Sequence, residues 1–421
     1  MKKTIKLLLL FMFIYNIVFS GLGTVASTGK IATLILSLYV FSKKKINLRV
    51  TKSNVAICSL YFMILLYAIL NFLFNGLVQS VMLARIIFYF LNTLYMSFVL
   101  SEIYSDTNEF MLSFFIITTI QAVFIIAGFV SYEFRVFVSE LLLNESNISI
   151  LSASRSAGFT NSSGANLSVI QALGFISGLL LITRSNKINI IYYIAMVVII
   201  FSIVLSGRTG FVLILIMLIP VISVYLKRYK SNWLGKMSIF KYVLVLALGL
   251  FIINVIMTEL TIIPYDVKNQ YFYIQNWIKE AFVISDNRTI NALTKMEIPK
   301  LDYKTFVGTS LVVDSKGLNA SGHDSGYIQT YFAMGLVFSI IFYFTVGIHL
   351  MTMILKNYIK LRKTNLLHPS IFFLMSIFIL EVKEPFIFKS PIALFLLVLI
   401  KLAIKDVNTI GDKLKYKIMK S

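Results

Sequence analysis

A few short polar stretches carry the side chains in this sequence that could do chemistry. Two arginines stand out, Arg155 before Ser-Ala-Gly-Phe-Thr-Asn and Arg208 between the glycines of Ser-Gly-Arg-Thr-Gly. A guanidinium presents a rigid fork of donors that matches phosphate oxygens, and flanking glycines let a bulky anion approach the backbone. The two arginines therefore indicate a diphosphate group as ligand. The alternative for Arg208 is an interfacial anchor that reaches lipid phosphates.

A histidine motif lies at the end of the long polar segment 258–325, where His323 stands in Ser-Gly-His-Asp-Ser-Gly-Tyr. An imidazole can take a proton from a sugar hydroxyl near neutral pH, or simply orient that hydroxyl. The neighbouring glycines and Asp324 indicate an exposed, hydrogen-bonded position. The alternative is that His323 is an incidental loop residue, which is what an isolated histidine usually is.

Charged residues at the ends of apolar runs are further candidates. Lys383 and Glu384 follow one such run in Glu-Val-Lys-Glu-Pro, and Arg85 lies inside another. Ionisable groups at membrane depth are costly, so each is a functional candidate by default. The alternative for Lys383 and Glu384 is a mutual ion pair at a helix end. The sequence does not indicate a partner for Arg85.

The sequence lacks the common motifs of metal-binding and nucleotide-binding sites. The three histidines are scattered, and the single cysteine, Cys58, lies in an apolar run that we expect to be buried. No HExxH stretch and no phosphate-binding loop with a Gly-Lys pair occurs. We therefore expect no metal and no cofactor.

Composition places the chain in the membrane. It has 421 residues, of which 58% are hydrophobic and 14% charged, with a mean hydropathy of +0.86. This balance is far from that of a soluble globular protein. The net charge of +21 would indicate nucleic acid in a soluble protein, but here the basic residues collect in alternate connections. We expect one membrane domain over residues 1–421 and no nucleic-acid partner.

A window of roughly 20 apolar residues gives about 12 membrane spans. They are 5–22, 25–42, 54–74, 81–100, 110–130, 165–182, 188–205, 211–226, 240–257, 326–349, 370–381 and 391–404. Lysines and arginines gather in the connections that lie on the same side as both termini, which the positive-inside rule assigns to the cytoplasm. The fold expected is therefore an all-α, polytopic helix bundle. A cleaved signal peptide at the start is the alternative to a first hairpin of helices.

The polar segment 258–325 is the one large connection, and the same rule places it outside. Apolar positions recur at helical spacing from Val267 to Ala281, with charged residues mostly on the other side. This pattern predicts an amphipathic helix that lies on the membrane or covers a cavity. We expect a structured extracytoplasmic loop within the single membrane domain.

Taken in order, these stretches resemble the Wzy-type repeat-unit polymerases and the related O-antigen ligases of bacterial surface polysaccharide assembly. The resemblance covers most of the chain: about 12 spans, the stretch from Arg155 to Asn161, the turn around Arg208, and the large late loop. That loop ends in His323-Asp324-Ser325-Gly326-Tyr327 and then Gly335, similar to the family's His-Asn/Ser-x-x-Leu followed by a glycine. Asp324 departs from that pattern. Lys383-Glu384 also resembles a late Lys-Glu of polymerases.

The resemblance implies a metal-independent glycosyl transfer at the outer face of the bacterial inner membrane. The donor would be a glycan on undecaprenyl diphosphate, and the acceptor a new lipid-linked repeat unit. Arg155 and Arg208 would hold the donor diphosphate and stabilise its developing charge. His323 would receive or steer the acceptor proton, with Asp324, Tyr327, Lys383 and Glu384 as further substrate-binding residues. Membrane lipid and a chain-length regulator protein would be partners.

Other functions remain open at this point. An O-antigen ligase uses the same donor but transfers the glycan to lipid A core, and the sequence alone does not separate the two enzymes. A flippase of lipid-linked sugars, or another transporter, predicts polar residues deep in many spans and repeated halves. This chain instead concentrates its polar groups at one face. A membrane scaffold would leave Arg208 and His323 without a role.

Overall fold

The structure is a computed structural model that describes residues 1–20, 27–43, 52–75, 80–142, 157–161, 164–184, 190–228, 295–314 and 318–420. Within these ranges every regular element is a helix, and extended pairing is limited to isolated bridges between Phe19 and Leu142 and between Val313 and Asn319. The expected all-α fold is confirmed for this part of the chain. The run 240–257 and the amphipathic segment from Val267 to Ala281 lie outside the described residues.

Six of the described helices are long and apolar enough to cross a membrane. They are Val55–Phe74, Val81–Ile103, Thr107–Val130, Ala165–Arg184, Thr209–Leu226 and Leu336–Lys356. Two shorter apolar helices, Ile190–Ser206 and Leu367–Glu381, accompany them. A chain with this many apolar helices is a multi-pass membrane protein. The total of about 12 spans stays a prediction.

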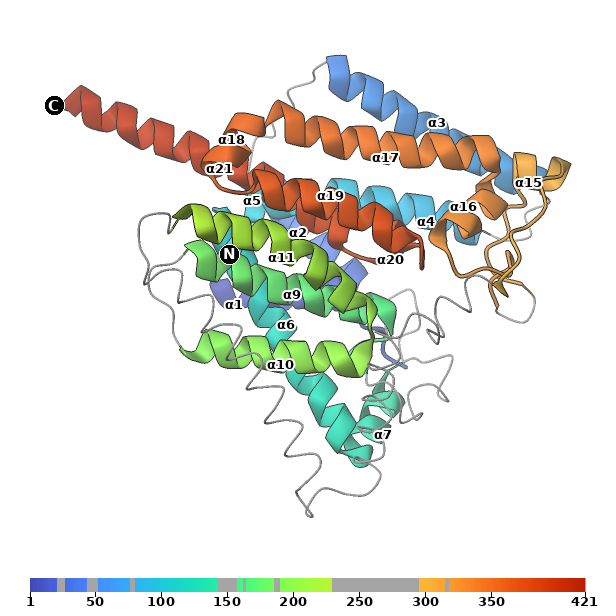
Figure 1. Ribbon diagram of the computed structural model, residues 1–421, viewed down its shortest axis with the longest axis horizontal. Helices are drawn as coiled ribbons and strands as arrows, with labels where there is room; N and C mark the ends of the chain where they lie inside the picture. Colours follow the sequence, from blue (N-terminus) through green and yellow to red (C-terminus); the bar gives the residue numbers. More distant parts are fainter. Residues whose placement is uncertain are drawn as a thin grey trace. The chain divides into compact units, whose positions relative to one another are not determined.

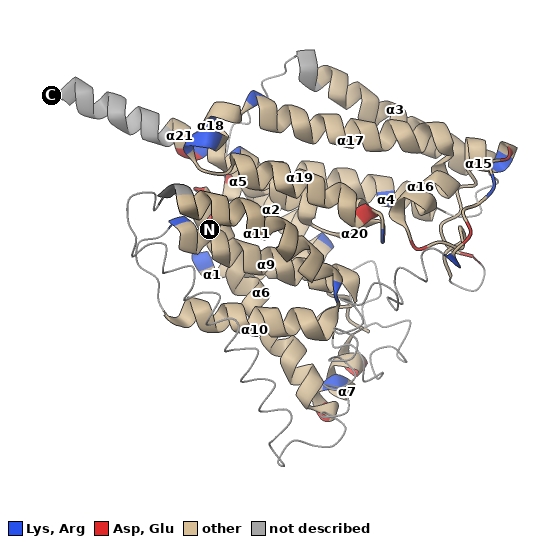
Figure 2. Cartoon of the chain, in the orientation of Figure 1, with Lys and Arg blue, Asp and Glu red and all other residues tan. Residues whose placement is uncertain are grey.

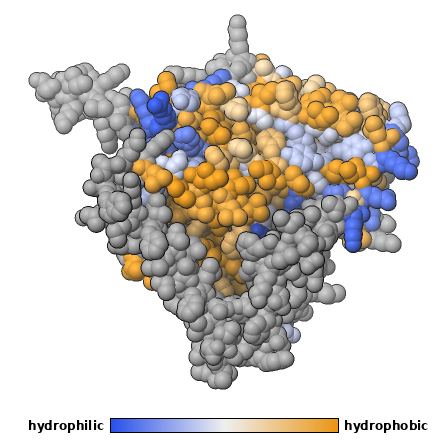
Figure 3. All heavy atoms as spheres, in the orientation of Figure 1, coloured by the Kyte–Doolittle hydropathy of each residue, from blue (hydrophilic) through white to orange (hydrophobic). Residues whose placement is uncertain are grey.

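The surfaces of these helices are apolar where a soluble protein would be polar. Leu34, Phe62, Leu215 and Phe344 are each more than half exposed, and orange, hydrophobic atoms dominate the described part of the face in Figure 3. Charged residues lie mostly near helix ends (Figure 2). Exposed apolar faces of this extent indicate contact with lipid.

The chain divides into two compact units, each described here by itself. Unit 1 comprises Met1–Leu38 and Thr107–Val283, and unit 2 comprises Tyr39–Asp106 and Ile284–Ser421. Both units are therefore built from segments that are distant in sequence.

Unit 1 is organised around α9 (Ala165–Arg184), which packs against three neighbours (Figure 1). These are α6 (Thr107–Val130), α10 (Ile190–Ser206) and α11 (Thr209–Arg228). Glycines allow the close approach of α9 to α6, because a Cβ on Gly174 would lie 2.0 Å from Thr118 Oγ1 and one on Gly178 2.7 Å from Phe115. The unit also contains α1 (Lys3–Tyr15), α7 (Tyr132–Leu141) and most of α2 (Thr28–Lys43).

Unit 2 is organised around the first half of α21 (Ile392–Lys420), which is almost completely buried from Ile392 to Ala403. The π-helix η2 (Tyr89–Tyr95) and α5 (Met96–Ile103) pack along it, and α4 (Val81–Phe88) leads into η2. Lys405 Nζ donates to the carbonyl oxygens of Ser101 and Tyr104, at 3.4 and 2.8 Å. These bonds satisfy carbonyls at the end of α5 that have no partner within the helix.

The remaining helices of unit 2 build the region that holds His323. α17 (Leu336–Lys356) runs beside α3 (Lys52–Phe74) and also contacts α19 (Leu367–Glu381) (Figure 1). Shorter elements connect them: α15 (Tyr303–Val307), α16 (Gly326–Met334), α18 (Tyr358–Lys363) and α20 (Phe386–Lys389).

Several boundaries differ from the predicted spans; α17 continues to Lys356 and α21 to Lys420, and two other differences have a local cause. The run 326–349 is not one helix, because Gly335 separates α16 from α17 with a φ of +82°. A Cβ at Gly335 would lie 2.4 Å from the carbonyl oxygen of Phe306, so this break requires glycine. The first helix ends at Tyr15 rather than near residue 22, because Asn16 adopts a left-handed conformation with a φ of 42°.

Candidate functional site

The Arg208 turn is held by glycine packing within unit 1. Gly207 and Arg208 alone separate α10 from α11, as the sequence predicts. The Gly210 N–H donates to Ser168 Oγ of α9 at 3.1 Å. A Cβ on Gly210 would lie only 2.3 Å from the Ser168 carbonyl oxygen. The backbone of the turn therefore rests directly on α9, and Arg208 is partly exposed at its tip.

Arg155 lies outside the described residues, but the end of its motif is tied into unit 1. Gln121 Nε2 donates to the Ala157 carbonyl at 3.0 Å, and Thr160 Oγ1 donates to the Tyr15 carbonyl at 2.8 Å. Asn161 Oδ1 accepts from the Val18 N–H at 2.7 Å. The stretch from Ala157 to Asn161 is thus anchored against α6 and the end of α1.

His323 lies in unit 2 and is buried, with 7% of its surface exposed. The expectation of an exposed position is wrong, because the polypeptide on both sides folds back onto the imidazole and its backbone. The Ser325 N–H donates to His323 Nδ1 at 3.0 Å, and the His323 N–H donates to Ser321 Oγ at 3.3 Å. Because Nδ1 accepts, the neutral ring carries its proton on Nε2.

Asp324, beside the buried histidine, is exposed. The Asn319 side chain donates to Asp324 Oδ1 at 2.7 Å, while Gln329 Nε2 donates to the Asp324 carbonyl at 2.9 Å. Gln329 Oε1 in turn accepts from Arg85 Nη1 at 3.3 Å. The partner of Arg85 that the sequence did not indicate is therefore a glutamine of α16, which links α4 to the His323 loop, residues 321–325.

A buried carboxylate lies against the start of α16. Glu381, the last residue of α19, has 0% of its surface exposed. Glu381 Oε1 accepts from the Tyr343 hydroxyl at 2.8 Å, and Oε2 accepts from the Ile387 N–H at 2.9 Å. The Arg85 guanidinium is also close enough to attract this carboxylate. Gly326 lies against it, because an added Cβ would be 2.4 Å from Oε1.

Lys383 and Glu384 follow Glu381 after Val382, so they lie at the corner between α19 and α20. Glu384 pairs with Lys389, with 3.8 Å between Oε2 and Nζ. Partial burial lowers the pKa of the Lys389 ammonium group, and the charge of Glu384 opposes this effect. The charges of Asp324, Arg85 and Glu381 also act on Lys389. The late Lys-Glu stretch and the histidine motif therefore form one polar cluster in unit 2.

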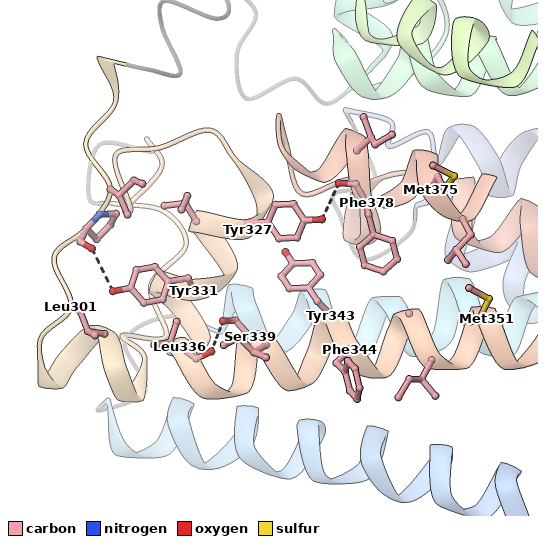
Figure 4. Close-up of a pocket in the computed structure, with 18 residues that line it drawn as sticks. Leu301, Tyr327, Tyr331, Leu336, Ser339, Tyr343, Phe344, Met351, Met375 and Phe378 are labelled. Carbon is pink, nitrogen blue, oxygen red and sulfur yellow. Dashed lines mark hydrogen bonds between the residues drawn. The ribbon is translucent and has the colours of Figure 1, made fainter. Parts of the chain in front are cut away.

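An apolar pocket of about 1160 Å³ begins beside this cluster (Figure 4). Tyr327 and Tyr343 line its polar end, and the Tyr327 hydroxyl donates to the Phe378 carbonyl at 2.9 Å. From there α17 lines the pocket from Leu336 to Met351, a length of roughly 22 Å at the rise of an α-helix. Leu374, Met375 and Phe378 of α19 form another wall. Such a pocket suits a long apolar chain.

Glu381, Gln329, Tyr343 and Lys389 were not selected from the sequence. One signal was present for Glu381, since an acidic residue that ends an apolar helix is costly and needs a partner. Tyr343 and Gln329 have polar partners from distant segments, namely Glu381 and Arg85. Their role could not be read from local pattern.

The described residues contain no group of three or more His, Cys, Asp or Glu side chains that could hold a metal ion. Cys58, expected to be buried, is exposed on α3.

No protein-family model matches this chain, and a search of the curated proteins finds no relative.

Proposed function

We propose that this protein is a polysaccharide polymerase of the bacterial inner membrane. It transfers a growing glycan from undecaprenyl diphosphate to a new lipid-linked repeat unit on the outer face. The bond between the anomeric carbon and the diphosphate oxygen breaks, and a bond from the acceptor hydroxyl oxygen to that carbon forms. The acceptor proton is lost and undecaprenyl diphosphate leaves.

One observation carries the proposal: the short helix α16 links a buried, hydrogen-bonded imidazole to an apolar pocket among apolar helices. The two are connected through α16, since Tyr327 lines the pocket and lies four residues after His323. Tyr343 lines the same pocket and donates to Glu381, which lies against Gly326 at the start of α16. This arrangement supports a substrate with a long apolar tail and a polar group that reacts at its end.

The diphosphate is assigned to Arg155 and Arg208. The tip position of Arg208 supports this role, because the packed backbone of the turn fixes the point from which its side chain can reach a developing charge. The end of the motif that follows Arg155 is anchored by hydrogen bonds of Gln121 and Thr160.

The acceptor hydroxyl is assigned to His323. In the tautomer favoured by the Ser325 N–H, Nε2 carries a proton and can donate it in a hydrogen bond to an incoming oxygen. This geometry supports steering of the hydroxyl over uptake of its proton. Asp324, Tyr327, Lys383 and Glu384 are assigned to the glycan, and the pocket to a lipid tail.

A polysaccharide gel from a strain that lacks this gene tests the proposal. A polymerase predicts that long chains collapse to single repeat units attached to the core, and that the wild-type gene restores them. Complete loss of attached polysaccharide, with accumulation of long lipid-linked chains, would instead show a ligase. An unchanged ladder would overturn glycan transfer altogether.

A further inference from the structure

Glu381 is the only buried carboxylate among the buried polar residues that the structure describes. It also contacts residues of several other helices. Its two oxygens accept hydrogen bonds from Tyr343 of α17 and from the Ile387 N–H of α20. Gly326, the first residue of α16, lies against the same group. One side chain therefore joins the end of α19 to three further helices.

The carboxylate also occupies a favourable electrostatic position. The first N–H groups of α16 have no carbonyl partner within the helix, and the helix dipole adds partial positive charge there. A negative group beside Gly326 offsets this charge. Arg85 attracts the same carboxylate. Two hydrogen bonds and the charge of Arg85 thus offset part of the cost of burying Glu381.

The His323 loop is the segment directly attached to this anchor. Ser325 precedes Gly326, and its N–H is the group that donates to His323 Nδ1. On the other side, Gln329 holds the Asp324 carbonyl and is itself held by Arg85. A shift in the first turn of α16 would therefore move the donor that sets the tautomer and direction of the imidazole.

We propose that Glu381 is a positioning residue that fixes the start of α16 and, through Ser325, the orientation of the His323 ring. It does not itself touch the substrate. Its effect on glycan transfer rests on the proposed function, whereas its effect on the loop does not. These two consequences can be measured separately.

Cysteine labelling of the full-length protein in membranes measures how accessible the His323 loop is. The background variant C58S removes the single, exposed cysteine, and S325C introduces the probe. Ser325 is 5% exposed, and its side chain makes no capping hydrogen bond to α16. Substitution by cysteine therefore removes no cap. We expect slow reaction of the introduced thiol with a membrane-impermeant maleimide when Glu381 is present.

E381Q keeps the size of the side chain but removes its charge and places an NH₂ group against a donor. A buried donor then lacks its acceptor, which destabilises the start of α16, so we expect the thiol introduced by S325C to label roughly tenfold faster or more. E384Q is the matched control, since Glu384 pairs with Lys389 at the same corner and no contact to α16 is assigned to it. Labelling of E384Q within twofold of the parent is expected.

A second variant guards against loss of folding. Y343F keeps the aromatic ring and removes one of the two hydrogen bonds to Glu381, so its labelling rate should fall between those of the parent and E381Q. Equal labelling of the parent, E381Q and Y343F would overturn the positioning role. If the E381Q protein is missing from the membrane, the labelling rate of Y343F relative to the parent decides whether Glu381 has the positioning role.

Chain synthesis gives the second readout, with the proposed polymerase activity as its basis. E381Q should lower kcat at least tenfold with little change in KM for the lipid-linked donor, because the tail pocket stays intact. A rise in KM with unchanged kcat would contradict positioning of His323. Faster labelling without any glycan transfer, even in the parent, would refute the proposed function while leaving the anchor role supported.

Discussion

The Arg208 turn and the His323 loop are both short polar connections beside apolar helices, yet they are held in opposite ways. The turn is fixed by backbone packing, because Gly210 approaches the Ser168 carbonyl too closely for any side chain. The loop is fixed by side chains from three helices, namely Arg85, Gln329 and Glu381, acting on the start of α16. Its glycine, Gly322, faces open space.

The difference matters for what each region can do. A turn that is packed on a helix holds an arginine in one place at little cost, which suits electrostatic binding of an anion. A loop held by hydrogen bonds sets the direction of a ring nitrogen, which suits proton and hydroxyl chemistry. Substitutions in the turn should therefore impair anion binding, whereas substitutions in the loop should impair proton and hydroxyl chemistry.

The largest effect is expected at Arg208. R208A should lower chain synthesis by about 10³-fold, because a charge-stabilising donor is lost, while the amount of protein in the membrane stays unchanged. R208K is the matched control and should retain part of the activity, since the charge remains but the fork is lost. Chain length on a polysaccharide gel, with an immunoblot for the protein, checks this. Normal ladders from R208A would remove the diphosphate role.

The next largest effect on chain synthesis is expected at His323, where substitutions separate steering of the acceptor hydroxyl from uptake of its proton. H323A should lower the rate by about 10²-fold. Glutamine places an amide near the position of Nε2 and can still donate, whereas asparagine places it near Nδ1. If His323 steers an oxygen through Nε2–H, H323Q should retain clearly more activity than H323N and H323A. Equal inactivity of all three variants would favour proton uptake instead.

Glycine substitutions sharpen the contrast in how the regions are held. G210A should lower stability by about 1–3 kcal/mol, because its Cβ would meet backbone atoms of Ser168 that must move. G322A should cost only about 1–2 kcal/mol, from its φ of +67° alone, since no atom lies within 4 Å of an added Cβ. Thermal unfolding in detergent measures both. A larger loss in G322A would show that the loop, too, depends on backbone packing.

The smallest effect concerns α15, which precedes the loop. The Thr305 N–H donates to Asp302 Oδ1 at 2.8 Å and lowers the pKa of Asp302. Because this pKa is lower in the folded state, the stabilisation is present above the unfolded value of about 3.9 and is lost as pH falls through the folded value. Hydrogen exchange of residues 303–307, corrected for intrinsic rate, should therefore accelerate on acidification below pH ~4. In D302N the corrected exchange should not change with pH, and a wild-type profile without acceleration would contradict the cap.

Much of the fold follows from local pattern. Apolar runs predicted α3, α6, α9 and α11 to within a few residues, because a lipid-facing helix needs a long apolar stretch. The break at Gly335 was missed, because the apolar run continues through it. The reason for the break lies in the contact with Phe306, a residue from another segment.

In the candidate site, too, a turn set by neighbouring residues could be predicted, whereas a contact set by distant residues could not. The turn at Arg208 follows from glycines adjacent in sequence, and its tightness could be predicted. Burial of His323 was not predicted, because polar neighbours usually indicate exposure, whereas here Ser321 and Ser325 hydrogen-bond to the histidine itself. Glu381 lies 55 residues after Gly326, so its contact with α16 is a property of the tertiary fold.

The most direct test of the proposed polymerase activity is chain synthesis by the purified full-length protein in lipid vesicles. The vesicles would carry only an undecaprenyl-diphosphate-linked repeat unit, with EDTA present throughout. We expect a ladder of longer lipid-linked glycans, with release of undecaprenyl diphosphate, and no ladder from R208A. Wild-type protein that is folded but leaves only single repeat units, or that needs added magnesium to extend them, would contradict metal-independent polymerisation.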